Sequence, residues 1–173
     1  MVDRQWIFKC ELELYSENDE MKRIYKMEKQ SEIVSLLQKT AENKKIILFD
    51  GVCNLCSSAV QFIIKHDKKD IFRFVALQSD LGKEICTYIG VDQTKIDSII
   101  MYNPAVAYYY KSNAVIEIAE DLGGLYSIMT IFKILPEKLR NYIYDYIAAN
   151  RYKWYGKKES CMIPTPELKA KFL

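Results

Sequence analysis

The segment from Lys44 to Asp67 constrains the fold of this chain more than any other part of it. An apolar run, Ile46–Phe49, ends at the turn pair Asp50-Gly51. A run rich in β-branched residues that stops at Asp-Gly predicts a buried strand that enters a turn. Apolar residues then recur at helical spacing, namely Cys56, Ala59, Val60, Ile63 and Ile64. We therefore expect a strand, a tight turn and an amphipathic helix in immediate succession.

A pair of cysteines, Cys53 and Cys56, lies where this strand passes into the helix. The first turn of a helix has unpaired N–H groups and a partial positive charge, which together stabilise a thiolate. We expect Cys53 at the helix start, within reach of solvent, and Cys56 as the more buried sulfur. This arrangement predicts a redox pair in which Cys53 is the nucleophile and Cys56 resolves the mixed disulfide. No cofactor is required, because electrons pass directly between sulfurs.

Two other interpretations of the cysteine pair stay open. The pair could be half of a metal site, although closed zinc sites usually need four Cys or His ligands. The chain has no second CxxC motif, and His66 is its only histidine. Alternatively, both thiols could be inert core residues of an interaction module without enzymatic activity.

Two polar residues flank the pair. Asp50 could be a partly buried carboxylate with a raised pKa that accepts the proton of Cys56. It could also be a turn residue that bonds its neighbouring backbone, as Asp before Gly commonly does. His66 lies near the end of the predicted helix, where the helix dipole favours it, and we assign it no catalytic role.

The following segments predict the rest of an α/β core. Strand, helix and strand at this spacing form a βαβ unit with parallel strands, and the next two strands suit an antiparallel hairpin. A final helix, capped by Ser112, should end at Gly123-Gly124. The predicted segments after the first helix are a strand at 71–76, a helix at 79–89, and strands at 98–102 and 106–111.

Several separated motifs resemble one protein family. They are Phe49 to Cys56, Phe74 to Ser79, Lys111 to Ala114, and Tyr144 to Pro164 with its run Asn150 to Gly156 and Cys161. In this order they are similar to the DCC family of thiol-disulfide oxidoreductases, named for its Asp, Cys and Cys. The resemblance covers roughly residues 45–164 and implies a thioredoxin-like fold. It also places the first letter of the family signature on Asp50.

The sequence departs from the thioredoxin-like pattern at a loop that normally binds substrate. The resemblance implies a cis-proline before the third strand, facing the cysteine pair, yet the segment Val91–Ser98 contains no proline. That loop normally offers backbone groups to an extended substrate and screens the cysteines from metals. Its absence argues against efficient handling of protein substrates and adds weight to the metal interpretation. We still rank redox chemistry first.

The C-terminal part predicts two helices between Leu125 and Ala149, divided at Leu135-Pro136. A basic and aromatic run, Arg151–Lys158, follows. We expect it to pack over the domain with its rings buried and its cations solvated, and we expect no nucleic-acid partner. If this tail folds back over the helix start, Cys161 could take part in exchange.

The whole chain has 173 residues and a net charge of +2, which predicts one domain with an appendage. We expect an N-terminal extension, partly helical, at 1–43, the thioredoxin-like domain at 44–164 and a tail at 165–173. No segment is apolar enough to span a membrane, and no secretory signal is visible. Five cysteines without an export signal favour the cytoplasm. Cys10 and Cys86 are interpreted as ordinary residues, and the thiol or disulfide substrate and the oligomeric state stay open.

Overall fold

The computed structural model describes residues 31, 35, 44–92, 98–104, 106–159 and 168–173. The chain divides after Leu37 into two units, and the cysteine pair belongs to the second, Gln38–Leu173. The predicted N-terminal extension, with Cys10, therefore lies almost entirely outside the described residues. The same holds for residues 93–97, where the proline-free loop lies, and for Cys161.

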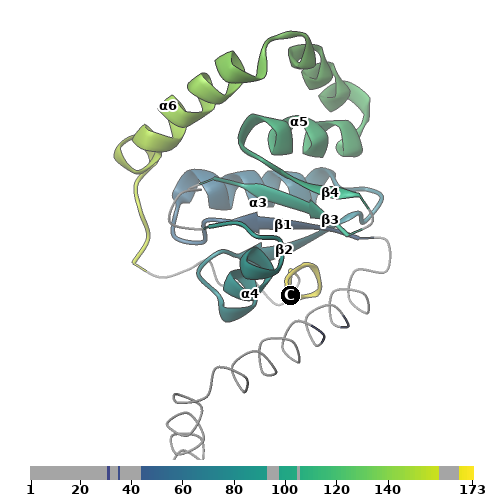
Figure 1. Ribbon diagram of the computed structural model, residues 1–173, viewed down its shortest axis with the longest axis vertical. Helices are drawn as coiled ribbons and strands as arrows, with labels where there is room; N and C mark the ends of the chain where they lie inside the picture. The colour runs from purple at the N-terminus through teal and green to yellow at the C-terminus, as the bar shows by residue number, and fades with distance from the viewer. Residues whose placement is uncertain (1–30, 32–34, 36–43, 93–97, 105, 160–167) are drawn as a thin grey trace, which may run out of the picture. The chain divides into compact units, whose positions relative to one another are not determined.

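A mixed sheet of four strands forms the centre of the second unit (Figure 1). Its strands lie in the order β2-β1-β3-β4. β1 (Lys45–Phe49) is parallel to β2 (Phe72–Ala76) and antiparallel to β3 (Ile100–Asn103), and β3 forms a hairpin with β4 (Ala107–Tyr110). These pairings confirm the predicted βαβ unit and the antiparallel hairpin. β1 is an inner strand covered on both faces, and its residues after Lys45 accordingly form one continuous apolar run.

Helices cover both faces of this sheet. α3 (Asn54–His66) and α5 (Lys111–Leu122) lie on one face, and α4 (Asp80–Tyr88) lies on the other (Figure 1). The core between the sheet and the first two helices comprises Ile47, Phe49, Val60, Ile63, Phe72, Phe74, Met101, Ala114 and Ile118. Cys86 is buried on α4, as expected of a core residue. This is an α/β structure with a thioredoxin-like βαβ–ββα core.

Two further helices follow α5, as the sequence predicts. η1 (Gly124–Ile134) is a 3-10 helix, and α6 (Glu137–Tyr155) begins after Pro136 and runs back towards the start of α3 (Figure 1). Gly123, with φ 70°, ends α5 at the predicted place. The predicted cap is wrong, because Ser112 instead donates its hydroxyl hydrogen to Asn141 Oδ1 on α6 at 2.5 Å.

The apolar face of α6 lies in solvent in the part of the chain that the structure describes. Its members recur at helical spacing and are 40–72% exposed; they are Leu139, Tyr142, Ile143, Tyr146 and Ile147. Apolar residues at helical spacing therefore mark one face of α6 without showing what covers it. Among the described residues, no helix is both long and apolar enough to cross a membrane.

The end of the chain packs against β2. Phe172 follows the short helix η2 (Lys169–Lys171), and its ring contacts those of Phe49 and Phe74. The backbone N–H of Leu173 donates a hydrogen bond to the carbonyl of Phe74 at 3.1 Å. Residues 168–173 therefore extend the edge of the sheet.

Candidate active site at the start of helix α3

Cys53 caps the N-terminus of α3. Its backbone is extended, with φ −85° and ψ 124°, and its Sγ accepts a hydrogen bond from the backbone N–H of Cys56 at 3.3 Å. An N-cap side chain satisfies one of the donors that the first helical turn leaves unpaired. The predicted succession of strand, turn and helix is confirmed, and it places the Cys53 sulfur at the positive end of the helix.

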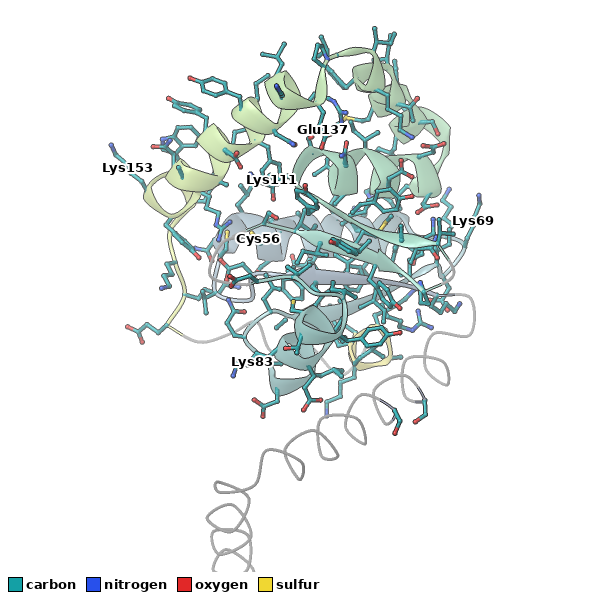
Figure 2. The ribbon with its side chains drawn as sticks, in the orientation of Figure 1. Cys56, Lys69, Lys83, Lys111, Glu137 and Lys153 are labelled. Atoms are coloured by element: carbon teal, nitrogen blue, oxygen red, sulfur yellow. The ribbon has the colours of Figure 1, made fainter. Side chains whose placement is uncertain are left out.

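The burial of the two sulfurs is the reverse of the prediction. Cys53 is 0% exposed, whereas Cys56 is only partly buried. Cys56 lies on the side of the domain where α6 ends (Figure 2). The expectation that Cys53 is the accessible thiol and Cys56 the more buried one is therefore wrong for this structure.

The segment that follows α6 packs against the turn that carries Cys53. We call Gly156–Lys158 the covering segment, because it runs across the turn that carries Cys53. Lys157 forms an antiparallel bridge with Cys53, and the N–H of Lys158 donates to the carbonyl of Val52 at 2.8 Å. The side chain of Asn54 donates to the Tyr155 carbonyl at 2.9 Å and fixes the same segment from the helix side.

Asp50 is buried beneath the cysteine pair and accepts four hydrogen bonds. The donors are Arg151 Nη2 at 2.8 Å, Gln78 Nε2 at 2.7 Å, the Val52 N–H at 3.1 Å and the Tyr152 hydroxyl. The contact with Arg151 is an ion pair between side chains that are 4% and 5% exposed. The bond to Val52 is the turn-residue pattern that the sequence allowed. The other donors come from positions 28, 101 and 102 residues further along the chain.

These contacts keep Asp50 ionised. Burial acts to raise the pKa of Asp50, but hydrogen bonds from Tyr152, Val52 and Gln78 and the charge of Arg151 outweigh it, so the pKa is lowered overall. The predicted raised pKa is therefore wrong. A carboxylate with a low pKa is a weak proton acceptor, so the general-base role proposed for Asp50 loses its physical basis.

Cys56 is held in the opposite state. Burial, together with the hydrogen bond and charge of Cys53, raises the pKa of the Cys56 thiol; Arg151 acts against this shift and Asp50 adds to it. Cys56 therefore stays protonated near neutral pH. The two sulfurs thus occupy different electrostatic environments, although only two residues separate them.

The geometry brings together three of the sequence-predicted site groups. Single ligand atoms of Asp50, Cys53 and Cys56 lie within 4.8 Å of one another, and both cysteines are free thiols. Three ligands are fewer than a closed zinc site requires, and both Asp50 oxygens already accept hydrogen bonds beside the Arg151 cation. This donor set fits a metal ion poorly.

The remaining predicted groups lie elsewhere. His66 is at the far end of α3, where its ring contacts Phe62 and Tyr126 and its Nδ1 lies 2.7 Å from the Phe62 carbonyl. Cys86 is on the opposite face of the sheet (Figure 1). Neither residue belongs to the cysteine site, in agreement with their assignment.

Sequence reasoning missed the roles of Gln78, Arg151 and Tyr152. The basic and aromatic run was expected to bury its rings and expose its cations. In fact Arg151 is buried and forms the ion pair, whereas Trp154 and Tyr155 are 49% and 52% exposed. The one signal in the sequence was that a buried Asp at a strand end needs a positively charged partner. Several basic residues could have been that partner, so the sequence did not identify Arg151.

The fold and the site together define a thioredoxin-like protein with a cysteine pair at the N-terminus of its first core helix. Residues 47–157 match the model of the DCC1-like thiol-disulfide oxidoreductase family, and the chain belongs to that family. It is 41% identical over 129 residues to the uncharacterized protein YuxK of Bacillus subtilis, which covers 75% of this chain and 93% of that protein. It is 35% identical over 121 residues to a chloroplastic DCC family protein of Arabidopsis thaliana, with 69% and 70% covered. No solved structure matches the chain.

Proposed function

We propose that this protein performs thiol–disulfide exchange with Cys53 as the nucleophile and Cys56 as the resolving thiol. The observation that carries this proposal is the Sγ of Cys53 at the N-cap of α3, where it accepts the Cys56 N–H. A thiolate in this position is stabilised, because the helix end is positive and a charged acceptor strengthens the hydrogen bond. The raised pKa of Cys56 keeps the second thiol protonated, and therefore unreactive, until the mixed disulfide has formed.

The exchange proceeds in two steps. The Cys53 thiolate attacks one sulfur of a substrate disulfide, and a bond from Cys53 to that sulfur forms as the substrate S–S bond breaks. The released thiolate takes a proton from solvent. Cys56 then loses its proton to solvent and attacks the Cys53 sulfur, which releases the second substrate thiol. The substrate disulfide is reduced to two thiols, and the protein is oxidised to a Cys53–Cys56 disulfide.

Asp50 acts in this scheme as a positioning residue. Its ionised carboxylate holds the Arg151 guanidinium in the site. The positive charge of Arg151 stabilises the Cys56 thiolate that forms in the second step. The Tyr152 hydroxyl donates to the same carboxylate, and its pKa is raised to about 12 by burial and by this hydrogen bond, so it stays a donor at neutral pH.

Reaction at Cys53 requires movement of the covering segment, because Cys53 is fully buried and bridged to that segment. Two backbone hydrogen bonds hold this segment on the turn, from Lys158 N–H to Val52 at 2.8 Å and from Asn54 N–H to Gly156 at a long 3.5 Å. The movement is therefore local and leaves the sheet intact. We propose the cytoplasm as the compartment, because a reducing environment suits a buried free thiol such as Cys86.

Trapping of the mixed disulfide tests the proposal. The Cys56→Ser protein, treated with the neutral bis(2-hydroxyethyl) disulfide, should accumulate one adduct at Cys53 by mass spectrometry. The Cys53→Ser protein should form far less adduct at Cys56 at pH 7, and Cys86 in both proteins reports on non-specific reaction. If neither variant forms an adduct under native conditions, the protein is better described as an interaction module that retains the fold.

A further inference from the structure

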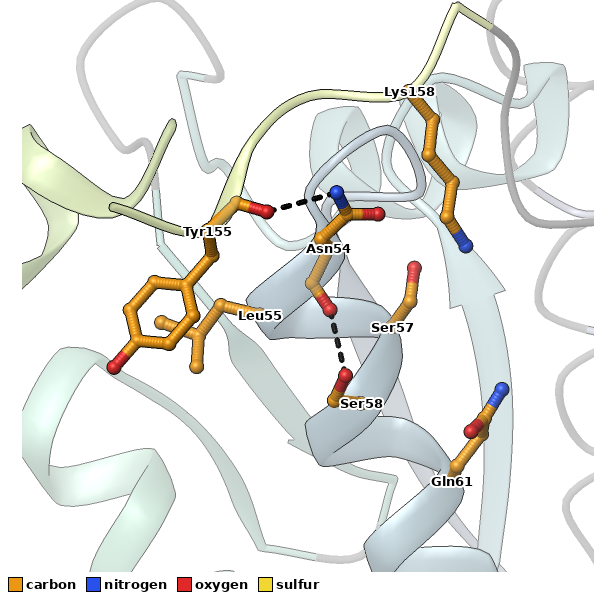
Figure 3. A pocket seen from close by; sticks show the side chains of 7 residues that line it. All are labelled: Asn54, Leu55, Ser57, Ser58, Gln61, Tyr155 and Lys158. Carbon is orange, nitrogen blue, oxygen red and sulfur yellow. Dashed lines mark hydrogen bonds between the residues drawn. The ribbon is translucent and has the colours of Figure 1, made fainter. Parts of the chain in front are cut away.

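A hollow of about 360 Å³ lies beside the first turns of α3, immediately next to the cysteine turn (Figure 3). α3 lines one side of it with Asn54, Leu55, Ser57, Ser58 and Gln61. Tyr155, at the end of α6, and Lys158, just beyond that helix, line the other side. Its volume lies within the ~300–1,000 Å³ range of small-molecule sites. The lining is mainly polar, so a ligand here would be held by hydrogen bonds and charge.

Ser57 supplies an independent sign of a ligand. It is 3% exposed, and its Oγ has no hydrogen-bond partner among the described residues. Figure 3 shows this hydroxyl directed into the space that the Lys158 side chain also enters. Buried polar side chains normally have a partner, and an unpaired hydroxyl that faces a hollow can bond to a polar group of a bound molecule.

The walls of the hollow carry positive charge, which favours an anionic ligand. Lys158 places its ammonium on one wall, and the N-terminal turn of a 13-residue helix forms the other. Both favour a negative group, since the ammonium is a cation and a helix N-terminus carries a partial positive charge. Lys158 forms no ion pair with any residue that the structure describes. A carboxylate therefore fits between these walls.

While the covering segment lies on the cysteine turn, the backbone groups of that turn cannot bind an extended polypeptide. A polypeptide that docks by strand addition needs free backbone groups. Here the Val52 carbonyl and the Asn54 N–H are taken by Lys158 and Gly156, and Cys53 is bridged to Lys157. The chain's own covering segment thus occupies the position of such a substrate, which leaves the hollow as the recognition site.

We propose that this hollow binds the carboxylate-bearing part of a low-molecular-weight disulfide, such as the disulfide of a short peptidyl thiol. The proposal rests on the exchange proposed at Cys53. The carboxylate pairs with Lys158, and the amide groups of the ligand meet Ser57 and Gln61. Cys53 then attacks the nearer sulfur once the covering segment shifts, and one carboxylate-bearing thiolate leaves and is protonated. Attack by Cys56 releases the second, so one disulfide becomes two thiols and the protein pair is oxidised.

Binding is tested without any exchange by S-methylglutathione, a thioether that cannot react. Calorimetry on the full-length reduced protein should show binding, and Lys158→Gln should weaken it about tenfold, the effect of one lost charge-assisted bond. Lys153→Gln removes an exposed lysine of α6 (Figure 2) and is the matched control, with affinity unchanged. Absence of binding by the unmodified protein at millimolar ligand overturns the proposal.

Ser57→Ala separates a binding role from a structural one. Because the hydroxyl is buried without a partner, its removal should leave the urea midpoint of unfolding unchanged or raise it, while S-methylglutathione binds severalfold more weakly. A purely structural serine would show the opposite, with a lowered midpoint and no change in affinity, and that result counts against the site.

Rates of exchange distinguish this proposal from the underlying activity. In the Cys56→Ser background, Lys158→Gln should slow mixed-disulfide formation with oxidised glutathione about tenfold more than it slows the reaction with bis(2-hydroxyethyl) disulfide. Equal losses with both disulfides would mean that Lys158 acts on the covering segment, which overturns the recognition proposal alone. If the neutral disulfide does not react at all, the exchange function itself fails.

Discussion

Arg151, in the last turns of α6, donates a hydrogen bond from Nη2 to Oδ2 of Asp50 at 2.8 Å, and this ion pair is almost completely buried. It joins the turn before the cysteine pair to a helix 101 residues further along the chain. Removing one partner of such a pair leaves the other charge buried without compensation, which is far more costly than losing an exposed ion pair.

Asp50→Asn should therefore lower the free energy of unfolding by about 3–5 kcal/mol. Asp80→Asn is the matched control, because Asp80 is almost fully exposed in its pair with Lys83, and it should change the stability by less than ~1 kcal/mol. Urea denaturation followed by circular dichroism measures both. Similar small losses for the two variants would contradict the buried ion pair.

The raised pKa of Cys56 predicts how its reactivity depends on pH. Only the thiolate reacts with iodoacetamide, so a thiol with a raised pKa gains rate only as the pH climbs well above the usual ~8.5. The protonated Cys56 thiol contributes to the stability of the fold below its ordinary pKa. This contribution is lost as the pH rises towards the raised pKa of Cys56 in the folded protein.

Mass-resolved alkylation of Cys56 in the Cys53→Ser protein should show a low rate through pH 9. This variant also removes the hydrogen bond and charge that raise the pKa of Cys56, so burial alone must sustain the effect. A thiol that titrates near pH 8.5 or below would show that burial does not control it.

Gly156 controls the covering segment. It has φ 83° and ψ 167°, a conformation that L side chains rarely adopt, and a Cβ here would lie 3.1 Å from Asn54 Nδ2. Gly156→Ala should therefore strain the segment by about 1–3 kcal/mol and speed alkylation of Cys53 severalfold in the Cys56→Ser background.

Gly90→Ala provides the control for this substitution. Gly90 also has positive φ, at 73°, but a Cβ there would meet nothing within 4 Å. It should cost stability without changing the rate at Cys53. Equal alkylation rates for both variants and the parent would mean that the covering segment does not limit access to the sulfur.

Local sequence patterns predicted the elements of this fold well and the environment of the site less well. The run Ile46–Phe49, the Asp-Gly turn and the spacing of Val60 and Ile63 depend on neighbouring residues, and the structure confirms the elements that they predict. Cys53 is bridged to Lys157, which is distant in sequence, and it is fully buried. No periodicity encodes such a contact.

The same limit applies to Asp50 and to α6. The Asp-Gly pattern identified the hydrogen bond that the Val52 N–H donates to Asp50. The pKa of Asp50 is lowered also by Tyr152, Gln78 and Arg151, which are distant in sequence. The spacing of Leu139 and Ile143 marked an apolar face on α6, yet both side chains are exposed in the described structure. Periodicity shows that a face exists, and only the tertiary arrangement shows whether it is covered.

The central claim is that Cys53 and Cys56 form a reversible disulfide, and a redox titration tests it most directly. The full-length protein is equilibrated across a series of reduced to oxidised glutathione, the free thiols are alkylated, and the products are resolved by mass spectrometry. The peptide that carries both cysteines should lose two hydrogens in one cooperative step and regain them on reduction, while Cys86 stays a free thiol throughout. Two alkylatable thiols at Cys53 and Cys56 in the most oxidising mixture would contradict the account.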